Sequence, residues 1–238
     1  MAAGRADQHS DLDFCLDVKD GVEGKVVRRV EKILSRLAPF DFSCERHNPH
    51  PKLRDFIYHL QGTPKTLVID LEIQSHSRKF VFTKSLPGDK IKVLFSRKGG
   101  VRFRALDRAA FRGRIRKRID DLNQTYVFHC DTYLAKNIAR DNYTEAFYYY
   151  QRYAVEPLIE LLRIRHCPLT WGELAFKHIR DDLPAGAVRT IDDFFRVNSV
   201  ADIGKKTQQA KALFAKLLAD VQPKYRDPAR ARIKPQRR

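Results

Sequence analysis

Residues 10 to 14 read Ser10-Asp11-Leu12-Asp13-Phe14 and open a stretch that ends at Val18. Polar and apolar residues alternate through this stretch, which predicts a β-strand from Asp13 to Val18. Two aspartates one residue apart on a strand point to the same face, so their carboxylates lie side by side. Because like charges repel each other, a site that keeps such a pair usually binds a hard cation. The pentapeptide therefore predicts a metal site on the first strand.

The segments that follow predict a small mixed sheet. Apolar residues at helical spacing predict an amphipathic helix from Val26 to Leu37, which Pro39 ends. The clearest signal is a hairpin, in which Gln61-Gly62-Thr63-Pro64 separates two runs of strand-forming residues. Those runs are residues 55–60 and 66–73, and further strands are expected over 40–45, 80–83 and 91–95, with a turn at 98–100.

Asp70 is the candidate third carboxylate, and it lies within the apolar run Leu67 to Leu71. A carboxylate in such a run is expensive to bury without a partner. If this strand lies beside the first, Asp70 joins Asp11 and Asp13 around one or two Mg²⁺ ions, an arrangement that suits phosphoryl transfer. Two structural alternatives stay open. An Asp-x-Asp pair is often only part of a turn, and Glu72 shares a strand face with Asp70 and can replace it.

After about residue 105 the pattern becomes helical. Asn142-x-x-Glu145 and Thr170-x-x-Glu173 each predict a capping box, and Pro157 is expected to kink or split a long helix. Helices are expected over 111–122, 127–139, 142–165, 170–180, 191–197 and 200–221. The predicted fold class is α+β, with a small mixed β-sheet core followed by a C-terminal α-helical bundle. The predicted domains are residues 1–105, residues 106–222 and a basic, disordered tail at 223–238.

The chain of 238 residues has a formal net charge of +17. Ten lysines and arginines lie between Arg97 and Arg118, and seven lie between Lys224 and Arg238. These blocks attract anions, but few aromatic residues lie within them to stack on bases, so nucleic acid is a possible partner that is not favoured. No apolar run is long enough to span a membrane, and no secretion signal opens the sequence. The four cysteines are far apart, which is typical of reduced thiols and predicts a cytoplasmic protein.

The stretch from Gly4 to Phe14 resembles the signature of the nucleotidyltransferase superfamily that shares the DNA polymerase β catalytic core. Within that superfamily the whole chain is most similar to antibiotic nucleotidyltransferases, such as the kanamycin and lincosamide enzymes. The residues Phe56 to Leu60 and Val68 to Leu71 resemble the hairpin that supplies the third carboxylate of this family. The helical half resembles the C-terminal bundle of the family, although only the first motif is specific.

The resemblance implies that Asp11 and Asp13 bind Mg²⁺, and that Asp70 completes the site and helps to deprotonate the acceptor hydroxyl. ATP or another nucleoside triphosphate would then donate a nucleoside monophosphate to a hydroxyl of a small molecule, and pyrophosphate would leave. Aminoglycoside-like acceptors, a role in antibiotic resistance and a homodimer belong to the same expectation. Ser10 is the candidate nucleotide-binding residue, because it precedes the two aspartates directly.

The sequence departs from the family at its start. The family has a Gly-Ser pair about eleven positions before the first aspartate, and counting back from Asp11 ends just before Met1. Such a pair holds the triphosphate through backbone amides. The catalytic domain is therefore expected to be incomplete at its N-terminus, either because the true start codon lies upstream or because the protein is truncated. Weak nucleotide binding is the expected consequence.

The acceptor side leaves alternatives open. Glu145 is a candidate substrate-binding acid for a cationic acceptor, although its place in a capping box is the favoured structural reading. The tyrosines 148–150 are candidates to line a sugar-like substrate, and at least one of them is expected to pack in the core. The competing functions are a protein- or RNA-modifying nucleotidyltransferase and an inactive remnant that has kept the fold.

Overall fold

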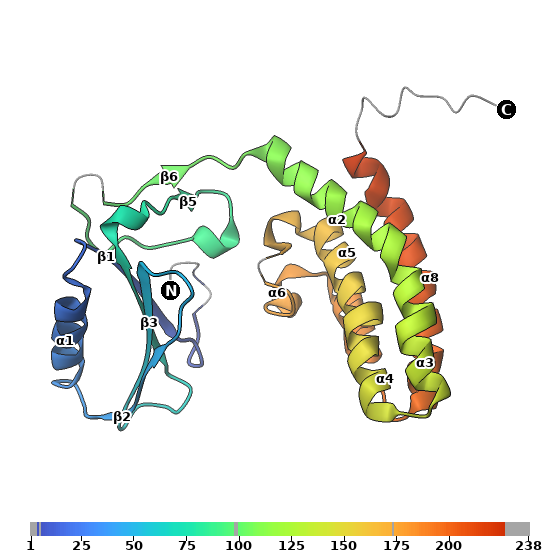
Figure 1. Ribbon diagram of the computed structural model, residues 1–238, viewed down its shortest axis with the longest axis horizontal. Helices are drawn as coiled ribbons and strands as arrows, with labels where there is room; N and C mark the ends of the chain where they lie inside the picture. The colour runs from blue at the N-terminus through green and yellow to red at the C-terminus, as the bar shows by residue number, and fades with distance from the viewer. Residues whose placement is uncertain (1–3, 5, 98–99, 173, 227–238) are drawn as a thin grey trace. The chain divides into compact units, whose positions relative to one another are not determined.

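The computed structural model describes residues 4, 6–97, 100–172 and 174–226. The chain divides into two compact units (Figure 1). The sheet unit comprises Met1–Lys84 and Asp89–Ala105, and the helical unit comprises Ser85–Gly88 and Leu106–Arg238. A small β-sheet region is thus followed by a helical region, which confirms the α+β class in its coarse form.

The sheet unit is built on one mixed sheet of four strands in the order β1-β4-β3-β2. Strands β1 and β4 run parallel, whereas β3 is antiparallel to both β4 and β2. The predicted hairpin is confirmed as β3 and β4, and Gly62 in the turn between them has a φ of 78° that suits glycine. The strands are β1 (Leu12–Val18), β2 (Phe40–Arg46), β3 (Leu53–Leu60) and β4 (Ile69–Ser75).

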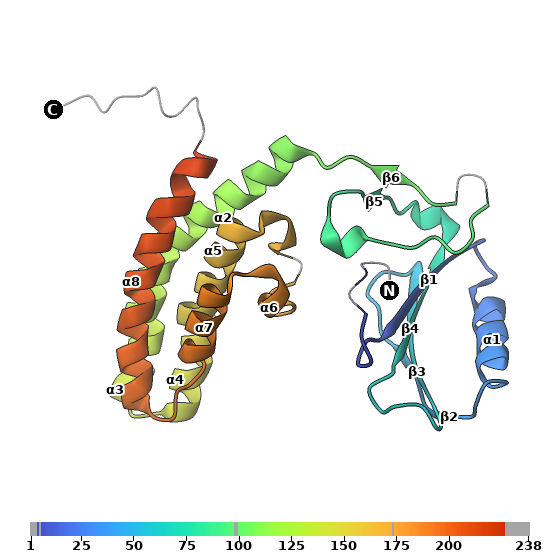
Figure 2. The ribbon, with the colours of Figure 1, turned by 180° about the vertical axis from the view of Figure 1, so that it is seen from behind.

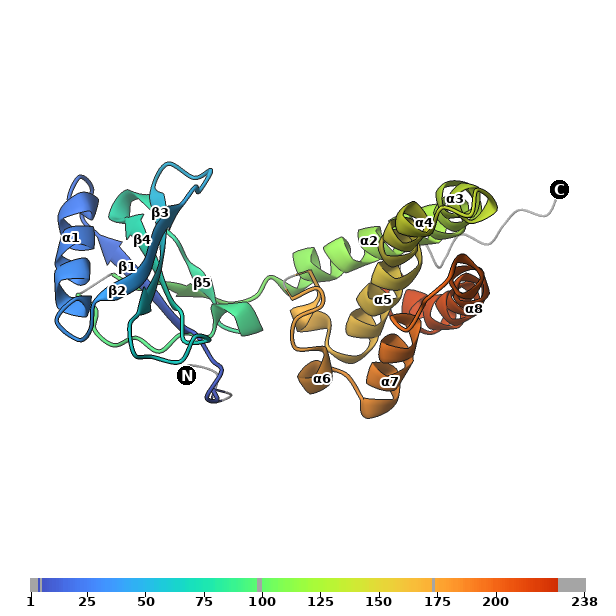
Figure 3. The same cartoon turned by 90° about the horizontal axis from the view of Figure 1, so that it is seen from below.

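Helix α1 (Glu23–Leu34) covers one face of this sheet (Figure 3). Val27 of α1 is buried among alternate residues of the two central strands, such as Leu71 and Tyr58. Because neighbouring residues of a strand point to opposite faces, this core leaves the remaining residues of β1 and β4 on the other face. The apolar face therefore holds the helix, and the polar face is left for chemistry.

The strand predicted over 91–95 is wrong. Those residues form no strand, and the large side chains of Leu94 and Phe95 are 67% and 80% exposed. The short strand β5 (Phe82–Thr83) pairs instead with β6 (Phe103–Arg104), which the sequence did not predict. Strand-forming composition over 91–95 thus had no partner to pair with. The turn predicted at 98–100 falls partly outside the described residues. Two 3₁₀ turns, η1 (His76–Arg78) and η2 (Pro87–Asp89), complete this part of the chain.

The helical unit contains two long helical segments, each with a π-helical turn inside it, followed by shorter helices and a last long helix (Figure 2). Its core is formed by apolar residues of α2, α5 and α8 together with both π turns. The elements are α2 (Arg108–His129), η3 (Cys130–Leu134), α3 (Ala135–Ala139), α4 (Tyr143–Tyr149), η4 (Tyr150–Val155), α5 (Glu156–His166), η5 (Pro168–Thr170), α6 (Ile179–Asp182), α7 (Ala185–Phe194) and α8 (Val200–Tyr225).

The break predicted at Pro157 takes the form of a π turn. Pro157 lies in the first turn of α5, directly after η4, so the helical path continues through it. Proline has no N–H to donate to the carbonyl four residues earlier. A wider turn with i→i+5 hydrogen bonds lies where that bond is missing. The proline therefore widens the long helix and does not split it.

The helix predicted over 170–180 is wrong. The structure has only the 3₁₀ turn η5 and the four-residue helix α6 in this region. Thr170 does not cap a helix, because its hydroxyl donates to the carbonyl of Cys167 at 2.9 Å and accepts from Nη1 of Arg163 at 2.8 Å. The buried guanidinium of Arg163 also donates hydrogen bonds to the carbonyls of Ala175 and Lys177, which turns these carbonyls away from helical geometry. Glu173, the other half of the predicted capping box, lies outside the described residues.

The end of the chain differs slightly from the predicted boundary. Helix α8 confirms the last predicted helix and runs on to Tyr225, so residues 223–225 belong to it and not to the tail. The short helix predicted over 191–197 begins earlier, at Ala185, and ends at Phe194. Residues 227–238, the rest of the predicted tail, lie outside the described residues. Across the described part of the chain, no helix has the length and apolar character needed to cross a membrane.

A carboxylate-lined sheet face as candidate active site

The face of the sheet opposite α1 carries a row-by-row arrangement of acids. Asp13 of β1 lies in register with Asp70 of β4. Two residues further along each strand, Cys15 lies in register with Glu72. Glu72 is in turn opposite Asp55 of β3. Residues in register on neighbouring strands share a face and stand about 5 Å apart. The face therefore gathers several carboxylates from three strands.

Asp13 and Asp70 are the closest match to the predicted metal site. The carboxylate of Asp13 is exposed, and it forms no hydrogen bond or ion pair with any residue in the described part of the chain. Asp70 is half-buried and is the in-register partner of Asp13, whereas Glu72 is displaced by one step. The register thus puts Asp70 nearer to Asp13 than Glu72 is, and the choice of Asp70 as the third acid stays a prediction.

The side chains of Asp11 and Ser10 both form hydrogen bonds within the protein. Asp11 precedes β1, and its Oδ1 accepts a hydrogen bond from the backbone N–H of Val68 at 3.3 Å, just before β4. The hydroxyl of Ser10 donates to Oδ1 of Asp7 at 2.9 Å and accepts from the backbone N–H of Asp7 at 2.9 Å. A hydrogen bond from the backbone N–H of His9, together with the one from the Ser10 hydroxyl, holds the pKa of Asp7 below its usual value. The predicted role of Ser10 in nucleotide binding stays a prediction, and it would need this small turn to open.

Arg46 is a functional candidate that the sequence did not reveal. It lies at the end of β2, and its Nη2 atom donates to both carboxylate oxygens of Asp70, at 2.7 and 2.8 Å. Charge-assisted bonds of this kind are stronger than neutral ones and orient the carboxylate. Arg46 therefore places a cation beside the predicted metal site and competes for the same lone pairs.

The pKa values of Glu72 and Cys15, which lie in register on this face, are raised. Desolvation raises the pKa of Glu72, and the negative charges of Asp55 and Asp70 raise it further. Desolvation, with Glu72 as the next cause, raises the pKa of the Cys15 thiol to about 11. Burial is the main cause of both shifts, and the neighbouring negative charges add to it. A bound cation would offset those negative charges.

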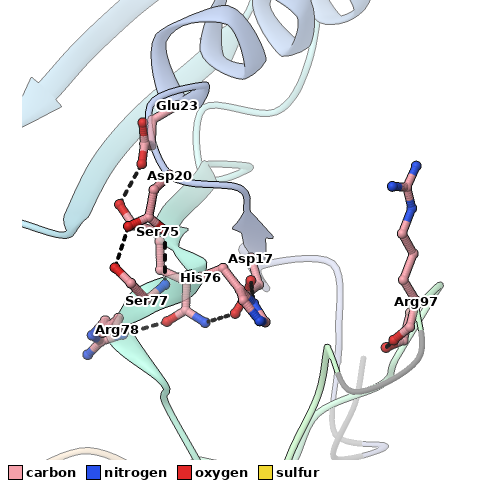
Figure 4. Close-up of polar contacts among 10 residues, drawn as sticks. Asp17, Asp20, Glu23, Ser75, His76, Ser77, Arg78 and Arg97 are labelled. Carbon is pink, nitrogen blue, oxygen red and sulfur yellow. Dashed lines mark hydrogen bonds and ion pairs between the residues drawn. The ribbon is translucent and has the colours of Figure 1, made fainter.

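A second set of acids, at the other end of β1, is used structurally (Figure 4). Oδ2 of Asp17 accepts from Gln74 at 2.8 Å, and its Oδ1 lies 2.7 Å from Nδ1 of His76. Ser77 donates both its backbone N–H and its hydroxyl to Asp20. Each carboxylate here has partners within the protein, so this end anchors the β1–α1 connection and is not a free acidic site.

The donor set on the polar face fits magnesium only in part. In the part of the chain that the structure describes, no group of three or more His, Cys, Asp or Glu side chains is arranged to hold a metal ion. The predicted trio of Asp11, Asp13 and Asp70 is therefore reduced to the pair of Asp13 and Asp70. Magnesium is commonly held by one or two carboxylates together with water and substrate phosphates. An oxygen pair with one free carboxylate fits that mode.

Glu145 and the three tyrosines belong to the helical unit. Asn142 accepts from the backbone N–H of Glu145 at 3.3 Å, which confirms the Asn cap, but the return bond from the Glu145 side chain is not formed among the described residues. The Tyr150 ring is buried and its hydroxyl donates to Phe194, which confirms that one of the tyrosines packs in the core. Tyr148 is 61% exposed. A role for Glu145 in substrate binding stays a prediction.

Part of this face could have been found from sequence. The alternation that places Asp11 and Asp13 on one face also places Cys15 and Asp17 there. Arg46 left no such signal, because its contact with Asp70 crosses the sheet from the far strand. Comparison of the chain with family models, with curated proteins and with solved structures finds no match.

Proposed function

We propose that the sheet unit is the catalytic domain of a magnesium-dependent nucleotidyltransferase, which moves a nucleoside monophosphate from ATP or another nucleoside triphosphate to a hydroxyl of a small molecule. One observation supports the proposal most: Asp13 and Asp70 stand in register on two parallel strands, on the face that α1 leaves uncovered. The two strands that carry these carboxylates are far apart in the sequence and are neighbours in the sheet.

Asp13 and Asp70 would hold the metal ion, and the phosphates of the nucleotide would complete its coordination. When bound, magnesium neutralises negative charge on the phosphates and lowers the pKa of an oxygen that it contacts. Asp70 would accept the proton of the acceptor hydroxyl, and its two hydrogen bonds from Arg46 would hold the orientation of that carboxylate. The nature of the acceptor rests on the family resemblance alone.

Calorimetric titration of ATP in the presence and absence of Mg²⁺ tests the proposal. The informative variants are Asp13→Asn and Asp70→Asn, which keep side-chain size and remove the charge. Glu72→Gln decides which acid partners Asp13, and Asp121→Asn is the matched control, because Asp121 is exposed in the helical unit. The expected result is Mg²⁺-dependent binding that is lost in the first two variants and kept in the control.

Three outcomes would overturn the proposal. ATP binding that is the same in Asp13→Asn as in the parent chain would show that the carboxylate pair does not hold the metal. Absence of any Mg²⁺-dependent binding by the parent chain would show that this chain lacks a working nucleotide site. Loss of binding in Glu72→Gln alone would move the site one step along the strands and refute the role given to Asp70.

A further inference from the structure

One end of the helical unit gathers cations from three helices that are far apart in sequence. The start of α2 contacts the end of α8, where Nη2 of Arg112 donates to the carbonyl of Lys224 at 2.5 Å and its guanidinium lies 5.0 Å from the centre of the Tyr225 ring. The end of α5 reaches the same place, because Nε of Arg165 lies 2.9 Å from Asp220 of α8. Figure 2 shows the start of α2 and the end of α8 at one end of the unit.

Three acids in this region are already engaged. Asp220 pairs with Arg165 and Lys224, and Glu160 accepts two hydrogen bonds from Arg118. Asp107 caps α2 by accepting from the backbone N–H of Ala110. The remaining cations exceed them. Arg108, Arg114, Lys117 and Arg226 form no ion pair with a carboxylate of the described residues, and the four together with Arg112 are here called the basic end.

Helix stability does not explain the cations of α2. The first turns of a helix carry a partial positive charge, so acids stabilise them and cations do not. The first turn of α2 nevertheless contains no acid, and Arg108 and Arg112 lie in its first two turns. Cations at the ends of α5 and α8 do complement those helices. The unfavourable placement on α2 points to an anion outside the protein.

Neighbouring cations add to the effect of burial on one group at this end. The pKa of His166, at the end of α5, lies below its ordinary value because of burial and because Arg165 and Lys224 stand close by. The buried stripe of α2, which includes Phe111 and Ile115, faces the core, whereas Arg114 and Lys117 are exposed. The positive charge is therefore both uncompensated and presented to solvent.

We propose that the basic end binds the phosphate backbone of a nucleic acid. Arginine supplies four of its five cations, and guanidinium groups match the geometry of phosphates. The exposed large apolar residues of the described helical unit are elsewhere, at positions 127, 128, 133, 143, 148 and 176, so this end offers no side chain to insert into a lipid layer. The sequence beyond Arg226 adds five further lysines and arginines.

Fluorescence anisotropy with a labelled single-stranded RNA of about 20 nucleotides tests the proposal, with a duplex of the same length beside it. The test variant is Arg108→Glu/Arg114→Glu/Lys117→Glu. The matched control is Lys136→Glu/Arg140→Glu/Arg189→Glu, which changes the net charge equally at exposed positions of the same unit that form no ion pair with a described carboxylate. Circular dichroism checks that both variants fold.

The parent chain is expected to bind RNA with an affinity that falls steeply as salt rises. For single strands each lost phosphate contact reduces the slope of log K against log salt by about 0.7, so the test variant should lose about two units of slope and at least about tenfold in affinity. The control should keep the slope. Asp13→Asn should bind RNA like the parent chain, because this surface is independent of the proposed catalytic site.

Four outcomes would overturn the proposal. Equal losses in the test and control variants would mean that only total charge matters. No RNA binding by the parent chain at about 0.1 M salt would remove the surface from consideration. Binding to vesicles that contain phosphatidylserine, without binding to RNA or duplex, would assign the basic end to a membrane surface. A chain that ends at Arg226 should retain the difference between the two variants, and its disappearance would assign binding to the last residues.

Discussion

Replacement of Arg163 by methionine should destabilise the helical unit more than any other single arginine substitution in α5. The side chain of Arg163 is 1% exposed and pairs with Asp182, which is 9% exposed, at 2.8 Å. The guanidinium also donates to the carbonyls of Ala175 and Lys177 and to the hydroxyl of Thr170. It thus holds an irregular segment that has almost no secondary structure of its own.

Removing one partner of a buried ion pair destabilises a protein by about 3–5 kcal/mol, because the other charge stays behind without compensation. A shift of about 10–15 °C in the melting temperature corresponds to this loss for a unit of this size. Arg165→Met is the matched control on the same helix. Its ion pair with Asp220 is 37% exposed on both sides, so the expected loss is below about 1 kcal/mol.

Tryptophan fluorescence and circular dichroism during urea unfolding separate local from global effects. The chain has one tryptophan, Trp171, which lies in the segment that Arg163 holds and donates to Glu160 at 3.3 Å. If the segment detaches first, fluorescence will change at a lower urea concentration than the helical signal does. Equal midpoints for Arg163→Met, Arg165→Met and the parent chain would refute the reasoning.

Three further predictions concern the sheet unit. Arg46→Met should tighten Mn²⁺ binding by about tenfold, or about 1.4 kcal/mol, because both oxygens of Asp70 become free. Electron paramagnetic resonance of free Mn²⁺ measures this affinity. An unchanged affinity would contradict the competition between Arg46 and the metal for Asp70. Glu72→Gln should speed alkylation of Cys15 at pH 8, because removal of the Glu72 charge lowers the pKa of this thiol from about 11. Mass spectrometry can follow the alkylation, with the exposed Cys44 as the internal reference. Hydrogen bonds from Ser77 and Ser75 lower the pKa of Asp20 and Glu23 in the folded state. Their stabilisation is therefore present above the unfolded values near 4 and is lost as the pH falls through the lower folded values. Thermal melts from pH 7 to 3 should show a smaller acid loss in Ser77→Ala, and identical acid profiles would count against the assignment.

Local patterns predicted the elements that depend on local physics. The alternation from Asp13 to Val18 and the hairpin around Gly62 are confirmed, because strand composition and turn chemistry act over a few residues. The pairing of Asp13 with Asp70 needed one further assumption, that the two strands are neighbours, and the parallel register bears it out. Whether the pair holds a metal remains a prediction.

The errors occurred where distant residues decide local structure. The sequence over 170–180 has a helical pattern, but the buried guanidinium of Arg163 on α5 donates hydrogen bonds to the carbonyls of Ala175 and Lys177. These tertiary contacts override the helical propensity of the segment. Residues 91–95 have strand composition but no partner strand. The contact of Arg46 with Asp70 depends on strand order and twist, which no short window of sequence contains.

The two π turns also affect how the row of buried side chains runs around the axis of each long helix. In the segment from α4 to α5 one row of buried residues recurs every fourth position, at 146, 150, 154, 158 and 162, with further buried residues beside it in α5. A four-residue step overshoots one α-helical turn by about 40°, so four such steps would carry the buried stripe about 160° around an uninterrupted helix. A π turn rotates less per residue than an α turn, so it winds the stripe back.

The segment from α2 to α3 follows the same rule, since its buried positions 122, 126, 130 and 134 are also four apart and η3 spans the last two. Coiled coils reconcile such a mismatch by winding helices around each other. Here a π turn inside each long helix removes much of the drift. Two neighbouring helices can therefore keep their apolar faces toward each other over a longer stretch than an uninterrupted α-helix would allow.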